Sequence, residues 1–192
     1  LGLARHLGEL GHRRVGVLCM RLGRGRHDGP ADDARQRAAT YPVQRNRLGG
    51  LREGFAEFGV DWSAVPVHER FIHSVDAGQS ATAELLAAHP EITAVVCTSD
   101  ILALGALRHA GERGLAVPDD LTVTGFDGVP EALRAGLTTV RQPVLEKGRA
   151  AGELLLERGE RNRPRTVILP TELVIGATSG RARAPERFFS GW

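Results

Sequence analysis

The chain has 192 residues, of which 42% are hydrophobic, so it is long enough to bury a substantial core as one large or two small domains. Its 25 basic and 23 acidic residues leave a net charge of +2, which gives no overall electrostatic attraction to nucleic acid or to a membrane. No apolar run approaches the ~20 residues that a membrane helix needs, and we expect no membrane contact.

In chain order, helix-like and strand-like segments alternate along most of the sequence. A polar stretch rich in Gly, Arg and Asp, residues 21–45, is too long for an ordinary connection, so we expect a functional or mobile loop there. We predict helices over 3–10, 47–58, 80–89, 100–114 and 145–159 and a short one near Pro130, and strands over 14–20, 65–72, 92–98, 121–126 and 137–142 and on both sides of Pro170.

The two cysteines, Cys19 and Cys97, lie far apart in apolar, strand-like runs. This placement predicts buried free thiols, which fit a protein of the reducing cytoplasm. The chain starts without methionine and directly in a helical pattern, so we expect that upstream sequence is missing.

The central strands are continuous apolar runs, which predicts an α/β fold with a doubly wound parallel sheet covered by helices on both faces. In such sheets, ligands bind beyond the carboxyl ends of the strands. We expect the strand ends to open into one crevice, and they carry Met20 and Arg21, Phe71 to His73, Ser99 and Asp100, and Phe126 and Asp127.

Asp127 directly follows a buried strand, so its charge must be solvated in a cleft, paired with a cation, or used to cap the short helix near Pro130. The strand-end position favours a ligand-binding role, and capping stays open. Ser99 and Asp100 precede a strongly predicted helix. At least one of them should be its N-cap, and either can also face a ligand.

Arg47 stands at the start of a helix that also contains Gly49, Gly50 and Gly54. Each glycine costs about 0.5–1 kcal/mol relative to alanine in a helix interior, so something must approach this helix closely. A guanidinium there can hold a hydroxyl, carboxylate or phosphate, although a surface salt bridge would also explain it. His73 can stack on a ligand or simply be an exposed loop histidine.

No pattern points to catalysis or to a metal site. The histidines form no H-E-x-x-H or Cys/His cluster, and there is neither a G-x-S-x-G elbow nor a phosphate-binding loop with lysine. We expect no catalytic residue, no metal and no cofactor, while an α/β enzyme that uses Asp127 as acid or base is an alternative. The helix from Asp100 is apolar nearly all round, which indicates a partner subunit.

Five stretches together resemble the effector-binding domain of lactose-repressor-type (LacI/GalR) transcription regulators. They are "LGELGHRRVGVL", "RLGGLREGF", "AVVCTSDILALGALRHAGERGLAVPDDLTVTGFDG", "LTTVRQP" and "TELVIGATSG". The match keeps its order along the chain outside residues 21–45 and the last dozen residues. The helix pattern S-D-x-x-A-x-G-A, followed by P-D-D-L-x-V-x-G-F-D and L-T-T-V-x-Q-P, is its most specific part.

The resemblance implies a periplasmic-binding-protein-like fold, in which two α/β subdomains joined by crossover strands bind a small molecule between them. Residues 1–12 would be the last helix of the N-terminal subdomain, and 13–133 the C-terminal subdomain with its long loop 21–45. Residues 134–160 would form a crossover strand and a helix of the N-terminal subdomain. Residues 161–180 would return to the C-terminal subdomain, and 181–192 would be a tail.

The resemblance also implies roles for single residues. The effector would be held by Arg47 and Asp127, with His73 or Phe71 as the stacking ring, Ser99 at a position that is Asn or Ser in the family, and Phe126 beside Asp127. The dimer contact would involve Ile101, Leu104 and Arg108. His73 stands where the family often has Trp or Phe, which bears on the identity of the effector.

These features imply a cytoplasmic, homodimeric transcription regulator whose effector, a sugar or related metabolite, controls DNA binding through a headpiece absent from this chain. An exported sugar-binding protein of a transporter shares the architecture and is the alternative. Arg21, Arg24, Arg26 and His27 lie beside the predicted crevice, so an anionic effector such as a sugar phosphate is a further expectation.

Overall fold

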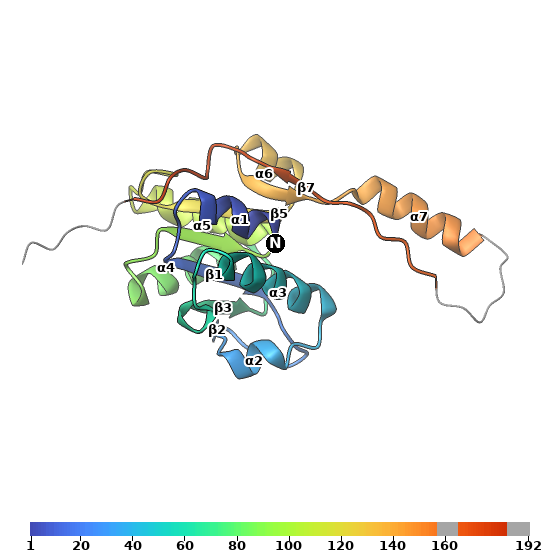
Figure 1. Ribbon diagram of the computed structural model, residues 1–192, viewed down its shortest axis with the longest axis horizontal. Coiled ribbons are helices and arrows are strands. Elements are labelled where there is room, and N and C mark those ends of the chain that lie inside the picture. The colour runs from blue at the N-terminus through green and yellow to red at the C-terminus, as the bar shows by residue number, and fades with distance from the viewer. Residues whose placement is uncertain (157–164, 184–192) are drawn as a thin grey trace, which may run out of the picture.

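A computed structural model describes residues 1–156 and 165–183, and its centre is a seven-stranded sheet in the order β2-β3-β1-β4-β5-β6-β7 (Figure 1). The strands are β1 (Val15–Met20), β2 (Gly29–Pro30), β3 (Val67–Arg70), β4 (Ala94–Cys97), β5 (Thr122–Asp127), β6 (Thr138–Arg141) and β7 (Glu172–Val174). Strands β3, β1, β4, β5 and β6 are parallel, while the edge strands β2 and β7 run antiparallel to their neighbours. The predicted α/β fold with a mostly parallel sheet is confirmed.

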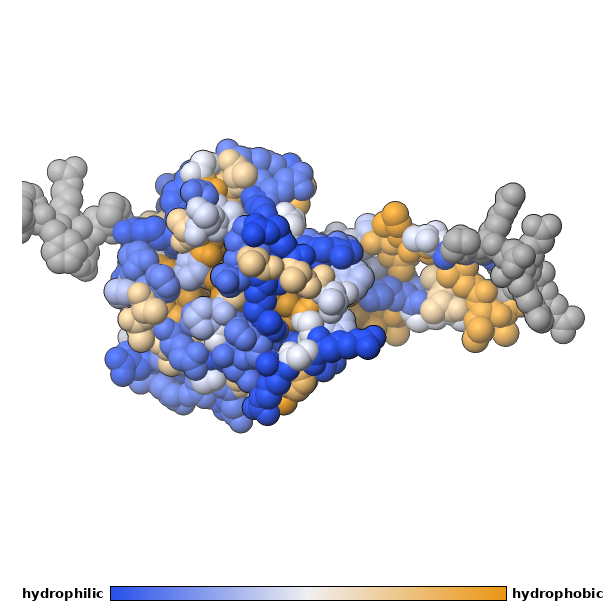
Figure 2. Space-filling model, turned by 90° about the horizontal axis from the view of Figure 1, so that it is seen from below, coloured by the Kyte–Doolittle hydropathy of each residue, from blue (hydrophilic) through white to orange (hydrophobic). Residues whose placement is uncertain are grey.

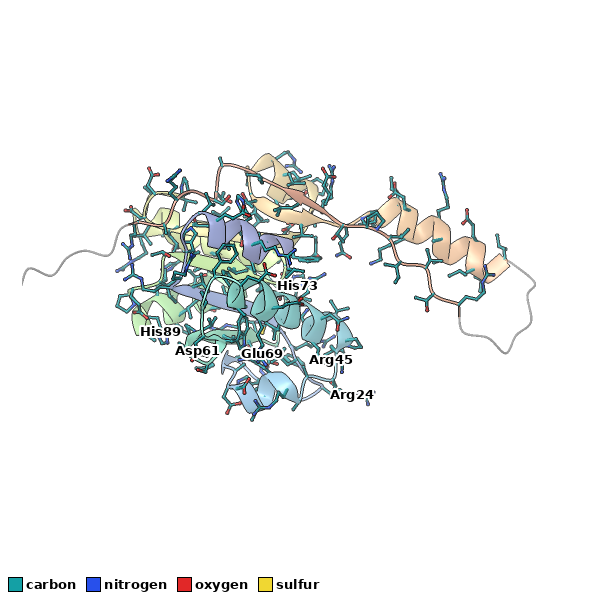
Figure 3. All side chains as sticks on the ribbon, in the orientation of Figure 1. Arg24, Arg45, Asp61, Glu69, His73 and His89 are labelled. Carbon is teal, nitrogen blue, oxygen red and sulfur yellow. The ribbon has the colours of Figure 1, made fainter. Side chains whose placement is uncertain are left out.

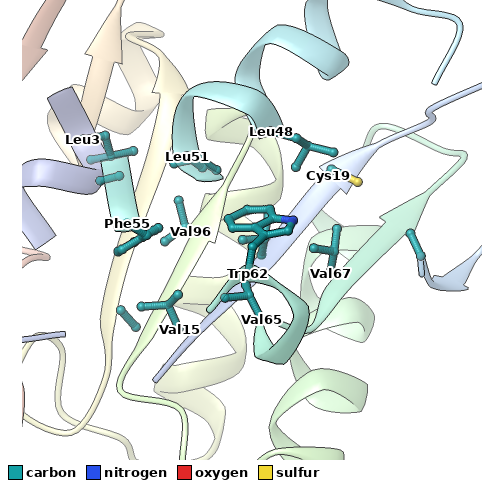
Figure 4. Close-up of a cluster of buried hydrophobic side chains, with 14 of the residues drawn as sticks. Leu3, Val15, Cys19, Leu48, Leu51, Phe55, Trp62, Val65, Val67 and Val96 are labelled. Carbon is teal, nitrogen blue, oxygen red and sulfur yellow. The ribbon is translucent and has the colours of Figure 1, made fainter. Parts of the chain in front are cut away.

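Helices cover both faces of the sheet. The helices of the described residues are α1 (Gly2–Glu9), α2 (Asp33–Arg37), α3 (Pro42–Ala56), the 3-10 helix η1 (Trp62–Ala64), α4 (Val75–Ala88), α5 (Asp100–Glu112), α6 (Pro130–Arg134) and α7 (Val144–Leu156). Helices α1 and α3 share one core with Val96 (Figure 4), and α4 and α5 share the other with Val95. Successive residues of a strand point to opposite faces of the sheet, and helices cover both faces. Residues on either side of a central strand must therefore be apolar, which explains the continuous apolar runs.

Helix α1 packs directly on α3, and its Leu3, Ala4 and Leu7 are buried in the same core as Phe55 (Figure 4). A Cβ added at Gly54 would lie 2.7 Å from the Cβ of Ala4, so glycine is what allows this approach. The close neighbour expected from the glycines of this helix is therefore the start of the chain. These contacts make α1 part of the helix layer of this sheet.

Residues 21–45 are structured rather than one long loop. They contain β2, α2 and the first turn of α3. Asp32 caps α2, since its Oδ1 accepts a hydrogen bond from Arg35 N at 2.7 Å, and the buried Gln36 accepts one from Trp62 Nε1 at 2.8 Å. Arg35 also binds the fully buried Glu69. Polar side chains therefore anchor this segment, whose low apolar content predicts mobility.

Strand β6 lies in the same sheet as β5, whereas α7 leaves the body and buries none of its residues (Figures 1 and 2). The strand of the segment 134–160 thus belongs to the present sheet, and the helix extends away from it. The last residues of the predicted helix 145–159 and the start of the expected return 161–180 lie outside the described residues.

After the gap, β7 is the single strand near Pro170, because residues 165–169 form none. Of the expected tail 181–192, residues 181–183 are described, and Ala182 N donates to Leu10 O at 2.9 Å. No helix in residues 1–156 or 165–183 combines the length and the apolar character needed to cross a bilayer.

Candidate functional site

The parallel strands bring their carboxyl ends to one edge of the sheet, as predicted. Figure 3 shows His73, Arg45 and Arg24 toward the side of the body from which α7 leaves, and His89 on the opposite side. Segments that follow β3, β1, β4, β5 and β6 therefore meet at this edge.

Arg47 and Asp127 form the centre of this edge. Arg47 Nη2 lies 2.9 Å from Asp127 Oδ1, and Nη1 donates to the backbone oxygen of Thr98. The guanidinium carbon lies 3.8 Å from the centroid of the Phe126 ring, a stacked cation–π arrangement. The side chain of Arg47 is 12% exposed and that of Asp127 25%, so this pair is not a surface salt bridge.

The backbone of Asp127 is unusual. Its φ is 127°, and in the described part of the chain it is the only non-glycine residue with a positive φ. Gln142, directly after β6, holds it: Gln142 Nε2 donates to Asp127 Oδ1 at 2.6 Å, and Gln142 N donates to Asp127 O at 3.1 Å. The N-cap of α6 is Val129, with no side-chain cap, so Asp127 does not cap that helix. Of the roles left open by the sequence, pairing within the crevice is the one that the structure shows.

Burial governs the titration of this site. Burial raises the pKa of Asp127, while the charge of Arg47 and its hydrogen bond, together with that of Gln142, offset part of the rise. Burial lowers the pKa of His73, with Asp127 acting in the opposite direction and Arg47 in the same one. The charge of Arg47 therefore affects the pKa of both Asp127 and His73, and the charge of Asp127 affects the pKa of His73.

Ser99 performs two tasks at the start of α5. It is the N-cap, with Oγ accepting from Leu102 N at 3.4 Å, and the same Oγ lies 2.8 Å from His73 Nε2. Capping was expected of Ser99 or Asp100. Because Ser99 is fully buried, it faces His73 rather than solvent.

Phe71 lies in a separate group of cations and rings. Its ring is 5.6 Å from the guanidinium carbon of Arg21 and 6.0 Å from that of Arg26, and Arg21 is also 5.4 Å from the ring of Tyr41. The structure thus joins Arg47, Asp127 and Phe126 into one cluster and His73 with Ser99 into a neighbouring pair, with Phe71 beside Arg21.

Three polar residues of this edge were not predicted: Thr98, Gln142 and Gln44. Gln44 is 2% exposed and its Oε1 accepts from Thr98 Oγ1 at 2.9 Å, which fixes the carbonyl group that binds Arg47. Thr98 and Gln142 both follow strands, so the strand-end rule had a signal for them. Gln44 is a helix residue with no signal in the sequence.

Two hollows flank the central pair. One of about 440 Å³ is lined by Arg47, Thr98 and Phe126, and another of about 800 Å³ by Asp127, Gln142 and the start of α7. On the surface of α5, Arg108 bonds Asp76 of α4, and Ile101 and Leu104 are half-buried. The dimer contact expected there stays a prediction.

Comparisons with known proteins identify the domain. A family model for a periplasmic binding protein-like domain matches residues 4–179. A HTH-type transcriptional regulator of Mycobacterium tuberculosis is 48% identical over 178 residues, which are 93% of this chain and 50% of that protein. The structure of a LacI-family transcriptional regulator from Corynebacterium glutamicum matches with a TM-score of 0.87 and 40% identity, over 93% of this chain and 53% of that one.

The chain belongs to the LacI family, as an effector-binding domain. This LacI-type domain is also 44% identical over 154 residues to the HTH-type transcriptional regulator IpsA of Corynebacterium glutamicum, which covers 80% of this chain and 43% of IpsA. A complex of the transcriptional regulator CelR with cellobiose shares the fold, with a TM-score of 0.75 and 29% identity over 92% of this chain and 50% of that one. The LacI-type domain thus spans about half the length of the relatives it matches. The family and the fold predicted from the sequence are confirmed.

Proposed function

We propose that this LacI-type domain binds a small polar metabolite of the sugar class and that binding controls the DNA affinity of the intact, cytoplasmic regulator. The observation that carries the proposal is the Arg47–Asp127 pair, stacked on Phe126 at the carboxyl edge of the sheet. The choice of a sugar as the ligand class is supported by the CelR–cellobiose complex, which has the same fold.

The chemistry of the pair suits a hydroxyl-rich ligand. A carboxylate accepts hydrogen bonds from hydroxyl groups, and a guanidinium donates them in a fixed fork, so neighbouring hydroxyls can bridge the two. Asp127 is held from both sides, by Arg47 and Gln142, which keeps its carboxylate in place before a ligand arrives. His73 and Ser99 offer a further donor and acceptor next to this pair. Such preorganisation lowers the entropic cost of binding.

The apolar face of α7 supports a second subdomain in the intact protein. Val144 is 67% exposed, and Leu145, Leu155 and Leu156 are 85%, 85% and 81% exposed (Figure 2). An apolar surface of this kind marks a contact with another part of a protein. We infer that it packs against further sequence of the same regulator, which would close the crevice over Arg47 and Asp127 and lead to a DNA-binding headpiece.

A homodimer would carry the signal. The half-buried Ile101 and Leu104 and the exposed Arg108 lie on α5, and we infer that this surface contacts a second subunit. A change in the angle between subdomains on effector binding would then alter the spacing of the two headpieces. Effector binding and DNA binding would thereby be thermodynamically linked.

The test is a thermal-shift screen of the intact regulator with sugars, polyols, sugar phosphates and nucleobases, followed by calorimetry on the compound with the largest shift. Asp127→Ala should abolish the ligand-induced shift while the protein still folds. Asp119→Asn, at an exposed aspartate outside the proposed site, is the matched control and should bind like the wild type. Equal binding by wild type and Asp127→Ala would overturn the proposal.

A further inference from the structure

Asp100, the first residue of α5, carries a buried carboxylate that is bound by hydrogen bonds rather than by a cation. It is 0% exposed and forms no ion pair with any residue of 1–156 or 165–183. Its Oδ2 accepts from Gly128 N at 2.6 Å and from Val129 N at 2.8 Å, and its Oδ1 accepts from Thr139 Oγ1 at 2.6 Å. These three bonds are what makes burial of the charge tolerable.

The three groups that donate hydrogen bonds to Asp100 come after Asp127, the proposed effector-binding residue, along the chain. Gly128 and Val129 come directly after Asp127, and Thr139 lies on the neighbouring strand β6. Asp127 and Gly128 have φ values of 127° and 75°, so the chain makes a sharp turn that is strained for an aspartate. A strained residue persists only where its surroundings hold it. Asp100 binds the backbone N–H groups of the two residues that follow Asp127.

The carboxylate of Asp100 also rests on the backbone of β5. A Cβ added at Gly125 would lie 2.3 Å from Asp100 Oδ1, a distance that no real Cβ contact shows, so only glycine leaves room there. Helix α5 in turn packs closely on α4. A Cβ at Gly105 would lie 2.2 Å from Val75 O, so glycine is what allows the two helices to approach. Asp100 therefore cannot shift without moving either the turn after Asp127 or the helix α5.

We propose that Asp100 is the positioning residue that aims the Asp127 carboxylate at Arg47 and couples the effector site to helix α5. The effector part of this inference rests on the proposed function above. Helix α5 also carries Leu104 and Arg108 of the proposed subunit contact. A displacement of α5 in the dimer then changes the turn at Asp127, and by thermodynamic linkage an effector at Asp127 displaces α5.

The first test needs no ligand. Amide hydrogen exchange, followed by NMR, should show that Asp100→Asn speeds exchange at Gly128 and Val129 by at least about tenfold, because a neutral amide oxygen accepts weaker hydrogen bonds than the charged carboxylate oxygen that both amides share. Asp120→Asn is the matched control, since Asp120 Oδ2 likewise accepts a backbone bond, from Ala116 N at 2.8 Å, but in a loop away from this turn. Unchanged exchange in Asp100→Asn would overturn the positioning role.

The second test separates positioning from simple loss of stability. With the screened compound of largest thermal shift, Asp100→Asn should raise Kd at least about tenfold, and Thr139→Val about threefold, while Thr139→Ser, which restores the hydroxyl, binds like the wild type. Ligand-induced NMR shifts of the Leu104 methyl groups should vanish in Asp100→Asn. A folded Asp100→Asn with wild-type Kd and wild-type Leu104 shifts would overturn the inference.

The two proposals fail in different ways. If Asp100→Asn does not fold, the Thr139→Val and Thr139→Ser pair decides the role of Asp100: equal Kd for the two variants overturns it. If Asp127→Ala leaves Kd unchanged, the proposed effector site is wrong, whereas the exchange rates at Gly128 and Val129 still judge whether Asp100 holds the turn.

Discussion

Arg47 and Asp127 are 80 positions apart in the sequence, yet Arg47 Nη2 donates to Asp127 Oδ1 at 2.9 Å. Helix α3 supplies the cation and the carboxyl end of β5 supplies the anion. Thr98 directly follows β4 and binds Arg47, and Gln142 directly follows β6 and binds Asp127, so four segments of the chain define one polar centre.

Arg47→Lys should bind the screened ligand much more weakly than the wild type, although the charge is kept. Lysine has no planar fork, so it cannot bind Thr98 O and Asp127 and also stack on Phe126. We expect a loss of about 2 kcal/mol, which is about thirtyfold in Kd, measured by calorimetry. Arg113→Lys, at an exposed residue near the end of α5, is the control; equal losses in the two variants would contradict a specific role for Arg47.

Gly54→Val should destabilise the domain, whereas Gly49→Ala should stabilise it. A Cβ at Gly54 meets Ala4 Cβ at 2.7 Å and Leu1 O at 2.9 Å, while a Cβ at Gly49 meets nothing within 4 Å. Overpacking at Gly54 should cost about 1–3 kcal/mol. Replacing Gly49 should gain about 0.5–1 kcal/mol of helix propensity. Urea unfolding measures both, and a neutral Gly54→Val would show that α1 does not pack on α3 in solution.

Stability should fall as the pH is lowered below about 6.5, the ordinary pKa of histidine. Burial lowers the pKa of His12 and of His68 in the folded state, so both favour the neutral form. The unfolded chain then binds more protons over this window, and the free energy of unfolding falls by up to about 1.4 kcal/mol per pH unit for each such group. The loss begins below the unfolded pKa and is complete only below the lowered folded one.

Urea titrations at pH 7.5, 6.5 and 5.5 measure this slope. His12 sits between Thr93 Oγ1 at 2.8 Å and Gly180 O at 3.1 Å, and glutamine can make similar bonds without titrating. His12→Gln should therefore reduce the slope. A slope identical to that of the wild type would show that His12 does not contribute.

Arg21→Ala should discriminate between an anionic and a neutral effector. Arg21 lies over the rings of Tyr41 and Phe71 and, in the part of the chain that the structure describes, Arg21, Arg24 and Arg45 form no ion pair. If the effector carries a phosphate, a single lost charge contact should weaken binding of glucose 6-phosphate or ribose 5-phosphate about tenfold and leave glucose or ribose unaffected. Equal effects on phosphorylated and free sugars would argue against an anionic effector.

Local sequence patterns were sufficient for most of the helices and strands and for the edge of the sheet at which the site lies. The apolar runs of β1 and β4 and the helix signals around Ser99 and Pro130 follow from hydrophobic periodicity and capping, which depend on neighbours in the chain. Since parallel strands end on the same side, Arg21, His73, Ser99 and Asp127 could be placed at one edge before any coordinates. The "GFDG" and "RLGGL" stretches added the family.

Tertiary structure decided the partners. Nothing near Gly54 in the sequence indicates that α1 is its neighbour, and nothing near Asp100 indicates that its carboxylate binds the turn after Asp127. The polar segment 21–45 folds because Gln36 meets Trp62 and Arg35 meets Glu69, contacts between residues far apart in the chain. Periodicity reports which side of an element is buried. Which group lies on that side depends on how the helices pack on the sheet, and only the folded chain brings those groups together.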